Sequence, residues 1–360
     1  MVQQRLRPII AIVDIRKDNM YSNCRFFLIL GKECNGSCIY CHQGLNDTPY
    51  GKVHEPLPDP KKVATYFPKE GGYTLTLYGG EPLLYWDFIV PFVYAIKNRN
   101  PQVRLTMVSN GFLLTKDKAK FMNENNIIFG LSHDGYYYQQ TRKKDDILQV
   151  NPEPFLLIDK KNIAATCSSL SSDFYQIWDY FDEFRVKHNV PIFPVAIQMM
   201  KDVENTTAEF LFIKNRKKYE QMLDKVFDNL YHNVMIDYFE CYEWMQYKRM
   251  IESLGRNLED KIPGLFCGAD TSTIDVDIYG NLYNCHNCCK PFSHISNGIK
   301  ASEKPFVPSE KCLSCLSYPL CGGLCYVAEQ SKKEYMCYTM TEQVKRLIEF
   351  LNKAGGNTNV

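Results

Sequence analysis

Short apolar runs alternate with amphipathic stretches over the first two-thirds of the chain. Strands are predicted at residues 26–30, 73–78, 103–108, 127–131, 163–167 and 192–199, and the first four are followed by a turn signal such as Gly, Asn-Gly or Asp-Gly. Helices are predicted between them at residues 59–67, 86–97, 116–125 and 173–188. This alternation is typical of parallel strands joined by crossover helices. Six such units are fewer than the eight of a closed barrel, so we predict an α/β fold with an open, partial (β/α)6 barrel.

The pattern changes in the last third of the chain. Residues 207–254 are predicted to be helical, because apolar residues recur there at helical spacing. Beyond Pro263, short strands predicted at 273–278 and 282–284 stand among cysteines and Gly-, Pro- and Ser-rich connections, and a closing helix is predicted at 343–352. The chain is therefore divided into an N-terminal segment (1–23), the partial barrel (24–205), a helical linker (206–262), a cysteine-rich domain (263–340) and a C-terminal helix with its tail (341–360).

The charge balance excludes some partners. Lys and Arg total 42 against 41 Asp and Glu, so a formal net charge of +1 gives no overall field that favours a nucleic acid or an anionic membrane. The longest apolar runs fall far short of the roughly 20 residues that a membrane span needs, and the N-terminus lacks the pattern of a secretory signal. We expect a cytoplasmic protein with no nucleic-acid or membrane partner.

The chain has 15 cysteines, and their number and positions indicate the kind of site it contains. The cytosol keeps thiols reduced, so an odd number of cysteines without an export signal indicates metal ligation rather than disulfides. Three cysteines fall within residues 34–41 and nine within residues 267–337. Cys24, Cys167 and Cys241 stand alone and are expected to pack as small hydrophobic residues.

The first group lies in the segment Cys34-Asn-Gly-Ser-Cys38-Ile-Tyr-Cys41, directly after the first predicted strand. Three thiolates on one short loop can ligate three irons of a [4Fe–4S] cluster. A fourth cysteine is missing from the following hundred residues, so one iron would stay open to a small molecule. A zinc site is the alternative, although four-ligand zinc sites usually come as two separated pairs.

This CxxxCxxC spacing resembles the signature of the radical SAM superfamily. The resemblance implies that Cys34, Cys38 and Cys41 hold a [4Fe–4S] cluster whose open iron binds S-adenosylmethionine. It further implies an enzyme in which the reduced cluster cleaves this cofactor to a 5′-deoxyadenosyl radical, which then abstracts hydrogen from a substrate. Tyr40 occupies the position where the family usually places an aromatic ring against the adenine.

A second segment that resembles a family motif follows the second predicted strand. Gly79-Gly80-Glu81-Pro82 matches the GGE motif of the family and comes 38 residues after Cys41. Its glycines expose backbone carbonyls and Glu81 supplies a carboxylate, and together these groups can receive the ammonium of the cofactor. An ordinary turn into a helix is the alternative interpretation.

The next two predicted strands also end in polar residues. Barrel-like folds carry their function at the C-terminal ends of the strands. Further candidate contacts to the cofactor are therefore Ser109, Asn110, Ser132 and Asp134. His133 stands where the family usually has an apolar residue, and no catalytic role is assigned to it.

The cysteine-rich tail resembles the SPASM extension of peptide- and protein-modifying members of the superfamily. Its spacing is matched by Cys267, Cys285, Cys312, Cys315, Cys321, Cys325 and Cys337. The resemblance implies two auxiliary [4Fe–4S] clusters, hence three clusters in all. One would be bound by Cys312, Cys315, Cys321 and Cys337, and the other by Cys267, Cys285 and Cys325. Two clusters need eight ligands, and these cysteines supply seven. The eighth ligand would be Cys288 or Cys289, or the iron without a ligand stays open to the substrate. A zinc ribbon built from the two CxxC-type pairs is the alternative to the clusters.

The tail also bears on the substrate. Sulfatase-maturating relatives typically carry an Asp base directly after the second tail cysteine, where this chain has His286. A neutral imidazole can accept a proton near physiological pH, so His286 is a candidate base, and a partly exposed hairpin histidine is the alternative. The resemblance favours hydrogen abstraction from a residue of a ribosomally made peptide or protein, giving a crosslinked or oxidised side chain.

Other functions stay open at this point. They are formylglycine maturation of a sulfatase, action on a small molecule, and a non-catalytic iron–sulfur scaffold that binds a partner. An electron donor such as a flavodoxin or ferredoxin is expected for the enzymatic alternatives. The sequence leaves open the identity of the substrate, the bond formed and the oligomeric state.

Overall fold

A curved, mostly parallel β-sheet forms the body of the protein. The structure is a computed structural model, and it describes residues 24–41, 56–191, 193–199, 213–232, 273–286, 290–299, 310–315, 317–318 and 330–355. Within these residues the sheet has nine strands, in the order β6-β5-β4-β3-β2-β1-β7-β8-β9. The strands span Arg25–Ile29 (β1), Thr74–Tyr78 (β2), Arg104–Ser109 (β3), Ile128–Ser132 (β4), Lys161–Cys167 (β5), Val195–Met199 (β6), Thr273–Asp277 (β7), Asn281–Tyr283 (β8) and Ser293–His294 (β9).

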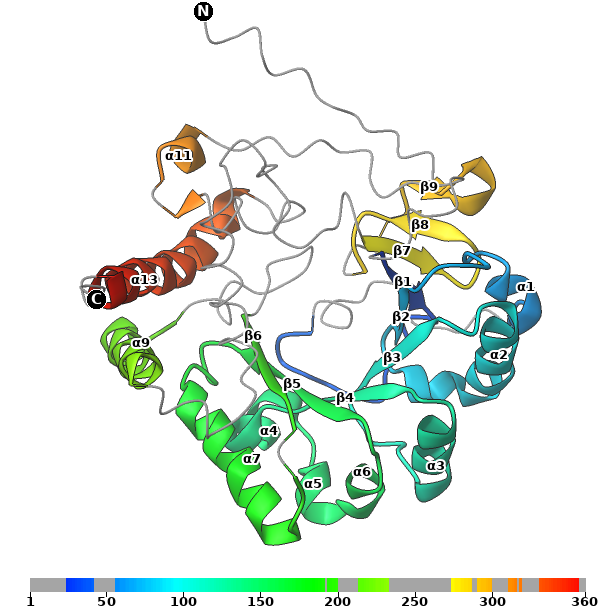
Figure 1. The fold of residues 1–360 in the computed structure, drawn as a ribbon, viewed down its shortest axis with the longest axis horizontal. Helices are drawn as coiled ribbons and strands as arrows, with labels where there is room; N and C mark the ends of the chain where they lie inside the picture. The colour runs from blue at the N-terminus through cyan, green and yellow to red at the C-terminus, as the bar shows by residue number, and fades with distance from the viewer. Residues whose placement is uncertain are drawn as a thin grey trace, which may run out of the picture.

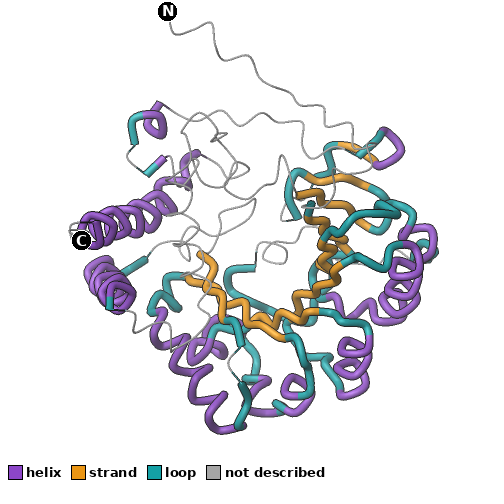
Figure 2. Tube along the Cα trace, viewed as in Figure 1, coloured by secondary structure: helices purple, strands orange, loops and turns teal. Residues whose placement is uncertain are grey.

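The helices that connect β1 to β6 lie along the outer side of this sheet (Figure 1). They are α1 (Pro60–Ala64), α2 (Trp86–Arg99), α3 (Lys116–Glu124), α4 (Tyr138–Arg142), α5 (Ile147–Val150), α6 (Glu153–Leu156) and α7 (Phe174–His188). Three 3-10 turns are η1 (Pro82–Tyr85), η2 (Gly135–Tyr137) and η5 (Ile295–Asn297). The strands follow an arc that does not close into a barrel within the described residues (Figure 2).

Local signals in the sequence set the ends of these helices. Asp59, Thr115 and Asp173 accept hydrogen bonds from backbone N–H groups two or three residues later, at the starts of α1, α3 and α7. Asn189 adopts the left-handed conformation that ends α7. The buried apolar positions of α7 recur at helical spacing, so that one face joins the core, at residues 174, 177, 178, 181 and 184.

The predicted alternation of strands and helices is confirmed. Strands β2 to β6 begin and end within three residues of their predicted limits. Each neighbouring pair from β1 to β6 is parallel. The α/β class and the open, partial barrel are therefore as expected from the sequence.

Strand β7 joins the barrel sheet, a pairing that the sequence pattern did not indicate. It runs parallel to β1, in a register from Arg25 opposite Thr273 to Ile29 opposite Asp277. The hairpin strands β8 and β9 then continue the sheet in antiparallel fashion. The cysteine-rich part of the chain is thus attached to the barrel through backbone hydrogen bonds. As a result, the segment after β8 lies close to the loop that follows β1.

Two helices follow the barrel at its β6 side, α9 (Arg216–Tyr231) and α13 (Gln330–Gly355). The first confirms part of the helix predicted at 207–254, but residues 213–215 and residue 232, which are also described, are not helical. The remaining residues of that prediction lie outside the described ones. The prediction of a helix beginning at residue 343 is wrong, because α13 begins at Gln330 and includes Cys337. Buried side chains at 336, 340, 344 and 347 show that its apolar face extends upstream, among Ser, Lys and Thr residues that mask it in the sequence. No helix in the described part of the chain is long and apolar enough to cross a membrane.

A short helix, α11 (Glu310–Leu313), carries the first of the paired tail cysteines.

Candidate functional site

The cysteine loop after β1 lies against the segment that ends β2. The Gly80 amide donates to the Gly31 carbonyl at 2.9 Å, and the Glu81 amide donates to the Glu33 carbonyl at 2.7 Å. A Cβ on Gly80 would lie 2.1 Å from the Glu33 carbonyl oxygen, and one on Gly79 would lie 2.4 Å from the Gly31 carbonyl oxygen. Glycine is therefore required at both positions for the two backbones to approach this closely.

Glu81 connects the ends of β2 and β3 from a buried position. Its Oε1 accepts from the Ser109 hydroxyl at 2.7 Å and the Leu83 amide at 2.9 Å, and its Oε2 accepts from the Asn110 amide at 2.8 Å. Burial raises the pKa of Glu81, against the hydrogen bonds that lower it. An ionised carboxylate has about four acceptor positions, so the protein itself occupies most of this one. In this arrangement Glu81 acts as a brace between the strand ends.

Asn110 extends this brace to the first cysteine. Its Nδ2 lies 3.6 Å from the Cys34 Sγ and donates to the Asn35 side-chain oxygen at 2.9 Å. The Gly36 amide donates to the same Cys34 sulfur at 3.3 Å. Burial raises the pKa of Cys34, and these two N–H groups lower it. Two donors on one sulfur favour the thiolate, which is the form that binds iron.

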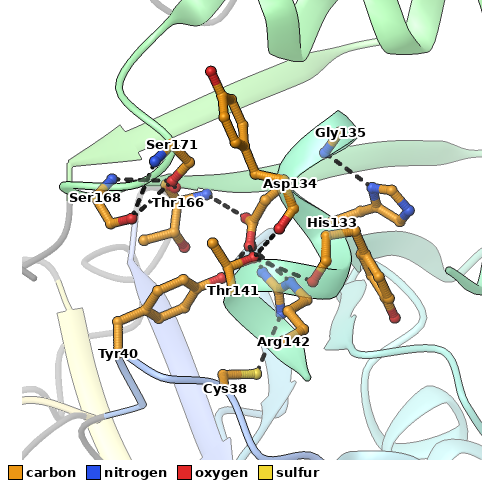
Figure 3. A network of polar contacts seen from close by, with 12 residues as sticks. Cys38, Tyr40, His133, Asp134, Gly135, Thr141, Arg142, Thr166, Ser168 and Ser171 are labelled. Atoms are coloured by element: carbon orange, nitrogen blue, oxygen red, sulfur yellow. Dashed lines mark hydrogen bonds and ion pairs between the residues drawn. The ribbon is translucent and has the colours of Figure 1, made fainter. Parts of the chain in front are cut away.

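A buried carboxylate at the end of β4 organises the other side of the loop (Figure 3). Asp134 accepts from the Tyr40 hydroxyl, from the Thr141 hydroxyl at 2.7 Å and from the Thr166 amide at 2.8 Å. Arg142 donates to both of its oxygens, from Nε and Nη2, at 3.1 Å each. Burial alone would raise the pKa of Asp134, but the guanidinium and the hydrogen bonds hold it below its usual value. Asp134 is therefore fully engaged by the protein.

Arg142 is the residue that Asp134 holds in place. Its Nη1 lies 3.8 Å from the Cys38 Sγ, and its guanidinium lies 5.7 Å from the centre of the Tyr40 ring. Burial raises the pKa of Cys38 to about 11, although the guanidinium lowers it. A fixed positive charge thus lies beside the cysteine loop.

The sequence reasoning missed Arg142, Thr141 and Thr166. One signal for Arg142 was available in the sequence, because it follows eight residues after Asp134, which stands at the end of a predicted strand. A buried Arg requires a paired carboxylate, and Asp134 is a nearby candidate for that pair.

The remaining polar residues at the ends of β3 and β4 are Ser109, Ser132 and His133. Ser109 belongs to the Glu81 brace and accepts from the Gly111 amide at 2.9 Å. Ser132 ends β4 at the same edge of the sheet and is half-buried. His133 is fully buried, and its Nε2 lies 2.8 Å from an Asp146 oxygen. His133 is therefore a core residue on the helix side of the sheet.

The tail contributes His286 to the neighbourhood of the first strands. Its ring stacks on Phe27 of β1 with centroids 4.1 Å apart and meets Tyr78 of β2 edge-on at 4.7 Å. Its Nδ1 lies 3.0 Å from an oxygen of the buried Asp275. Burial first, and then the charges of Cys285, Cys41 and Asp275, raise the pKa of Tyr78. Cysteines of the loop and of the tail thus both act on one half-buried tyrosine.

The geometry of the cysteines bears on what they can hold. Charges on Cys34 and Cys41 both act on Cys38, so the three thiols are close neighbours. Nevertheless, no three His, Cys, Asp or Glu side chains in the described residues are close enough for one metal ion. Three thiols on one short loop can each ligate one iron of a [4Fe–4S] cluster.

Four of the predicted tail ligands lie in the described residues. Cys285, Cys312, Cys315 and Cys337 are half-buried. The remaining predicted ligands lie outside the described residues and are Cys267, Cys288, Cys289, Cys321 and Cys325.

Comparisons with known proteins agree with this site. Residues 28–152 match the model of the radical SAM superfamily. The chain is 24% identical over 330 residues to a cysteine-type anaerobic sulfatase-maturating enzyme of Clostridium novyi, covering 81% of this chain and 84% of that protein. A solved structure of native anSMEcpe with bound AdoMet and Cp18Cys peptide has a TM-score of 0.66 at 19% identity, covering 92% of this chain and 99% of that one. Streptococcus suis SuiB bound to precursor peptide SuiA has a TM-score of 0.60 at 16% identity, covering 85% and 72%.

The two structural likenesses establish the fold, and the family match covers the cysteine loop, the Gly79-Gly80-Glu81 segment and the Asp134 network. A radical SAM domain uses a [4Fe–4S] cluster and S-adenosylmethionine, and the cysteine loop fits that requirement. Residues 28–152 are therefore similar to the radical SAM superfamily, and the chain is an enzyme similar to those that mature sulfatases.

Proposed function

We propose that this enzyme abstracts hydrogen from a residue of a ribosomally made peptide or protein and leaves a crosslinked or oxidised side chain. The observation that carries the proposal is the attachment of the tail to the barrel sheet through β7, beside β1. This pairing lets the charges of Cys285 and Cys41 act on the same tyrosine, Tyr78. The similarity to a sulfatase-maturating enzyme and to two folds that hold peptides supports the choice of a peptide.

The residues around the cysteine loop suit the cofactor chemically. Cys34, Cys38 and Cys41 would hold the cluster, and the Arg142 guanidinium suits the carboxylate of S-adenosylmethionine. Backbone carbonyls near Gly79 and Gly80 would receive its ammonium. When bound, the cluster and S-adenosylmethionine together supply a carbon radical that abstracts hydrogen.

The protein's own groups hold this site in place. Glu81 and Asn110 fix the loop from the β2 and β3 side, and Asp134 fixes Arg142 from the β4 side. Tyr40 and Asp134 are buried, so the charges near the loop act in a medium of low polarity. Tyr40, Ser132 and the brace residues remain candidate contacts to the cofactor.

His286 is the candidate base for a proton lost from the substrate. A proton on its Nδ1, donated to Asp275, leaves Nε2 as the acceptor. Asp275 would thus orient the ring and select its tautomer.

The tail cysteines would hold two auxiliary clusters, with three clusters in the whole enzyme. Their ligands would be those given by the SPASM resemblance, with Cys288 or Cys289 as the eighth. A flavodoxin or ferredoxin would supply the electron, in the cytoplasm.

Formylglycine maturation of a sulfatase is the second candidate function. The similarity to a sulfatase-maturating enzyme over 81% of the chain favours it. The presence of His286 in place of an Asp makes it the weaker of the two.

Anaerobic reconstitution followed by metal analysis and mass spectrometry tests the proposal. We expect about twelve irons per chain for three clusters, reductive cleavage of S-adenosylmethionine, and loss of hydrogen from a peptide encoded beside the gene. Cys38→Ala should remove about four irons and stop the cleavage, whereas Cys24→Ala, outside both cysteine groups, should keep them. Exchange of a cysteine sulfur for oxygen in a sulfatase peptide would instead support the second candidate. Iron near four in the unaltered enzyme would refute the auxiliary clusters.

A further inference from the structure

A cavity of about 320 Å³ lies on the helix side of the sheet, beside the segment that follows β4. Its lining residues come from η2, α4, α5 and α7 and from the residues before α5. The helices α4, α5 and α7 lie outside the arc of strands (Figure 1). Its volume is at the lower end of the range for small-ligand sites. The walls relevant here are Tyr136, Tyr138, Tyr180, Asp145, Asp146 and Gln149. We call this cavity the tyrosine pocket.

The tyrosine pocket contains a carboxylate, Asp146, that forms no ion pair with a Lys or Arg side chain in the described residues. Asp146 accepts from the His133 Nε2 at 2.8 Å, the Tyr180 hydroxyl at 2.6 Å and the Leu148 amide at 2.9 Å. The His133 Nδ1 accepts from the Gly135 amide at 3.1 Å, so this ring carries its one proton on Nε2 and is neutral. Within the described residues, no Lys or Arg side chain pairs with Asp146.

The hydrogen bonds to Asp146 also keep it ionised. Burial alone would raise the pKa of Asp146, but its donors, His133 foremost, hold it below the usual value. A buried carboxylate with only neutral donors is costly unless a cation comes close to it.

The tyrosines supply a second, independent signal of a ligand. Tyr138 is 1% exposed, and its hydroxyl has no hydrogen-bond partner among the described residues. A buried hydroxyl without a partner costs free energy, which a bound donor would recover. The rings of Tyr136 and Tyr180 meet edge to face at 5.2 Å, and tyrosine faces attract cations. Burial and the carboxylates of Glu183 and Asp179 raise the pKa of Tyr136 to about 12, so this hydroxyl stays neutral and two further negative charges lie near Tyr136.

From these contacts we propose that the tyrosine pocket binds the ammonium or guanidinium of a lysine or arginine side chain of the substrate, other than the residue that is modified. The cation would approach Asp146, donate to the Tyr138 hydroxyl and contact the tyrosine rings. Naming a peptide as its source rests on the proposed function, whereas the preference for a cation rests on the pocket alone. A free alkylamine has the same chemistry, and the experiment separates the two sources.

Equilibrium titration of the reconstituted enzyme tests the ligand class. The probes are acetyl-Ala-Lys-Ala-amide, its norleucine counterpart without the charge, and n-butylammonium. We expect the lysine peptide to bind at least about tenfold more tightly than the norleucine peptide, because hydrogen bonds to charged groups are the strong ones. Equal binding of the two peptides would overturn the proposal. Binding of n-butylammonium without binding of the lysine peptide would identify a free amine and overturn the peptide as source.

Two variants locate the binding. Val150→Lys places a competing ammonium at the rim of the pocket, where Val150 is 71% exposed, and should weaken lysine-peptide binding about tenfold. Val186→Lys makes the same change at a 64% exposed position of α7 outside the pocket and should not alter binding. Tyr138→Phe removes only the unpartnered hydroxyl and should weaken binding by about threefold to tenfold.

Unchanged binding in both Val150→Lys and Tyr138→Phe would refute the assignment of the pocket. Thermal unfolding of each variant shows whether it is folded. Cleavage of S-adenosylmethionine by the unaltered enzyme is measured separately, because its failure would contradict the proposed function and leave the pocket untouched.

Discussion

Gly80→Ala should disable the cysteine loop while leaving the fold intact. The added Cβ would lie 2.1 Å from the Glu33 carbonyl oxygen and 2.4 Å from the Lys32 carbonyl oxygen. Both are backbone atoms, so no flexible side chain can move aside to relieve the contact. Either the cysteine loop or the segment after β2 must shift.

The size of that shift follows from the contacts. Cβ atoms essentially never come closer than 3.0 Å to another heavy atom, so the 2.1 Å contact must lengthen by about 0.9 Å. Such a shift also breaks the bonds from the Gly80 and Glu81 amides to the loop, at a cost of about 1–3 kcal/mol for the two. Because misplacement by about 1 Å can lower a rate by about a hundredfold, we expect a loss of that size in cofactor cleavage.

Anaerobic reconstitution provides the assay. Iron content, the electron paramagnetic resonance of the reduced cluster and the rate of S-adenosylmethionine cleavage are compared with those of Gly72→Ala. Gly72 is the matched control, because a Cβ there has nothing within 4 Å. We expect full loading and cleavage in the control. Normal cleavage and a normal cluster spectrum in Gly80→Ala would refute the close approach on which the reasoning depends.

Three further predictions concern buried charges and the candidate base. Arg142→Gln should lower the free energy of unfolding by about 3–5 kcal/mol, because it leaves the Asp134 carboxylate buried without its cation. Adding Asp134→Asn to this variant should restore part of that free energy. Urea titration measures both variants. Burial lowers the pKa of His133 in the folded protein below its usual value of about 6.5, so the neutral ring contributes its full stability above that pH. As the pH falls below about 6.5, the unfolded chain takes up the proton first, and stability should decline by up to about 1.4 kcal/mol per pH unit; a flat profile between pH 7 and 5.5 would contradict this. His286→Asn should reduce substrate modification by about a hundredfold, more than it reduces cofactor cleavage, and Asp275→Asn should give a smaller loss; equal losses of both activities in His286→Asn would contradict its role as a base.

The sequence predicted the elements that depend on neighbouring residues. Strand β3 was expected at 103–108 and spans Arg104–Ser109, because an apolar run and the Asn-Gly that follows it define such a strand locally. The cysteine loop and the Gly79-Gly80 segment were likewise visible as spacings. Their proximity followed from the rule that parallel strands end at one edge.

Contacts between residues far apart in the chain could not be predicted from these local patterns. A five-residue run such as β7 does not specify its partner, and its parallel pairing with β1 joins residues almost 250 positions apart. The role of Arg142 depends on a carboxylate that only the fold brings to it. Even a recognised motif does not reveal the contacts of its residues. The spacing around Glu81 indicated a carboxylate near the cysteine loop, but it could not indicate that backbone amides already donate to that carboxylate.

The pairing of β7 with β1 has a consequence for the order in which the protein is made. Strand β1 leaves the ribosome early, but its second partner is completed only when Asp277 has been synthesised. Until then, the β1 edge of the growing sheet offers unpaired backbone groups to any other extended chain. A fragment that stops before Thr273 would keep that edge open permanently. Cutting the chain between the barrel and the tail is therefore expected to yield an aggregating fragment, and the two parts have to be produced together.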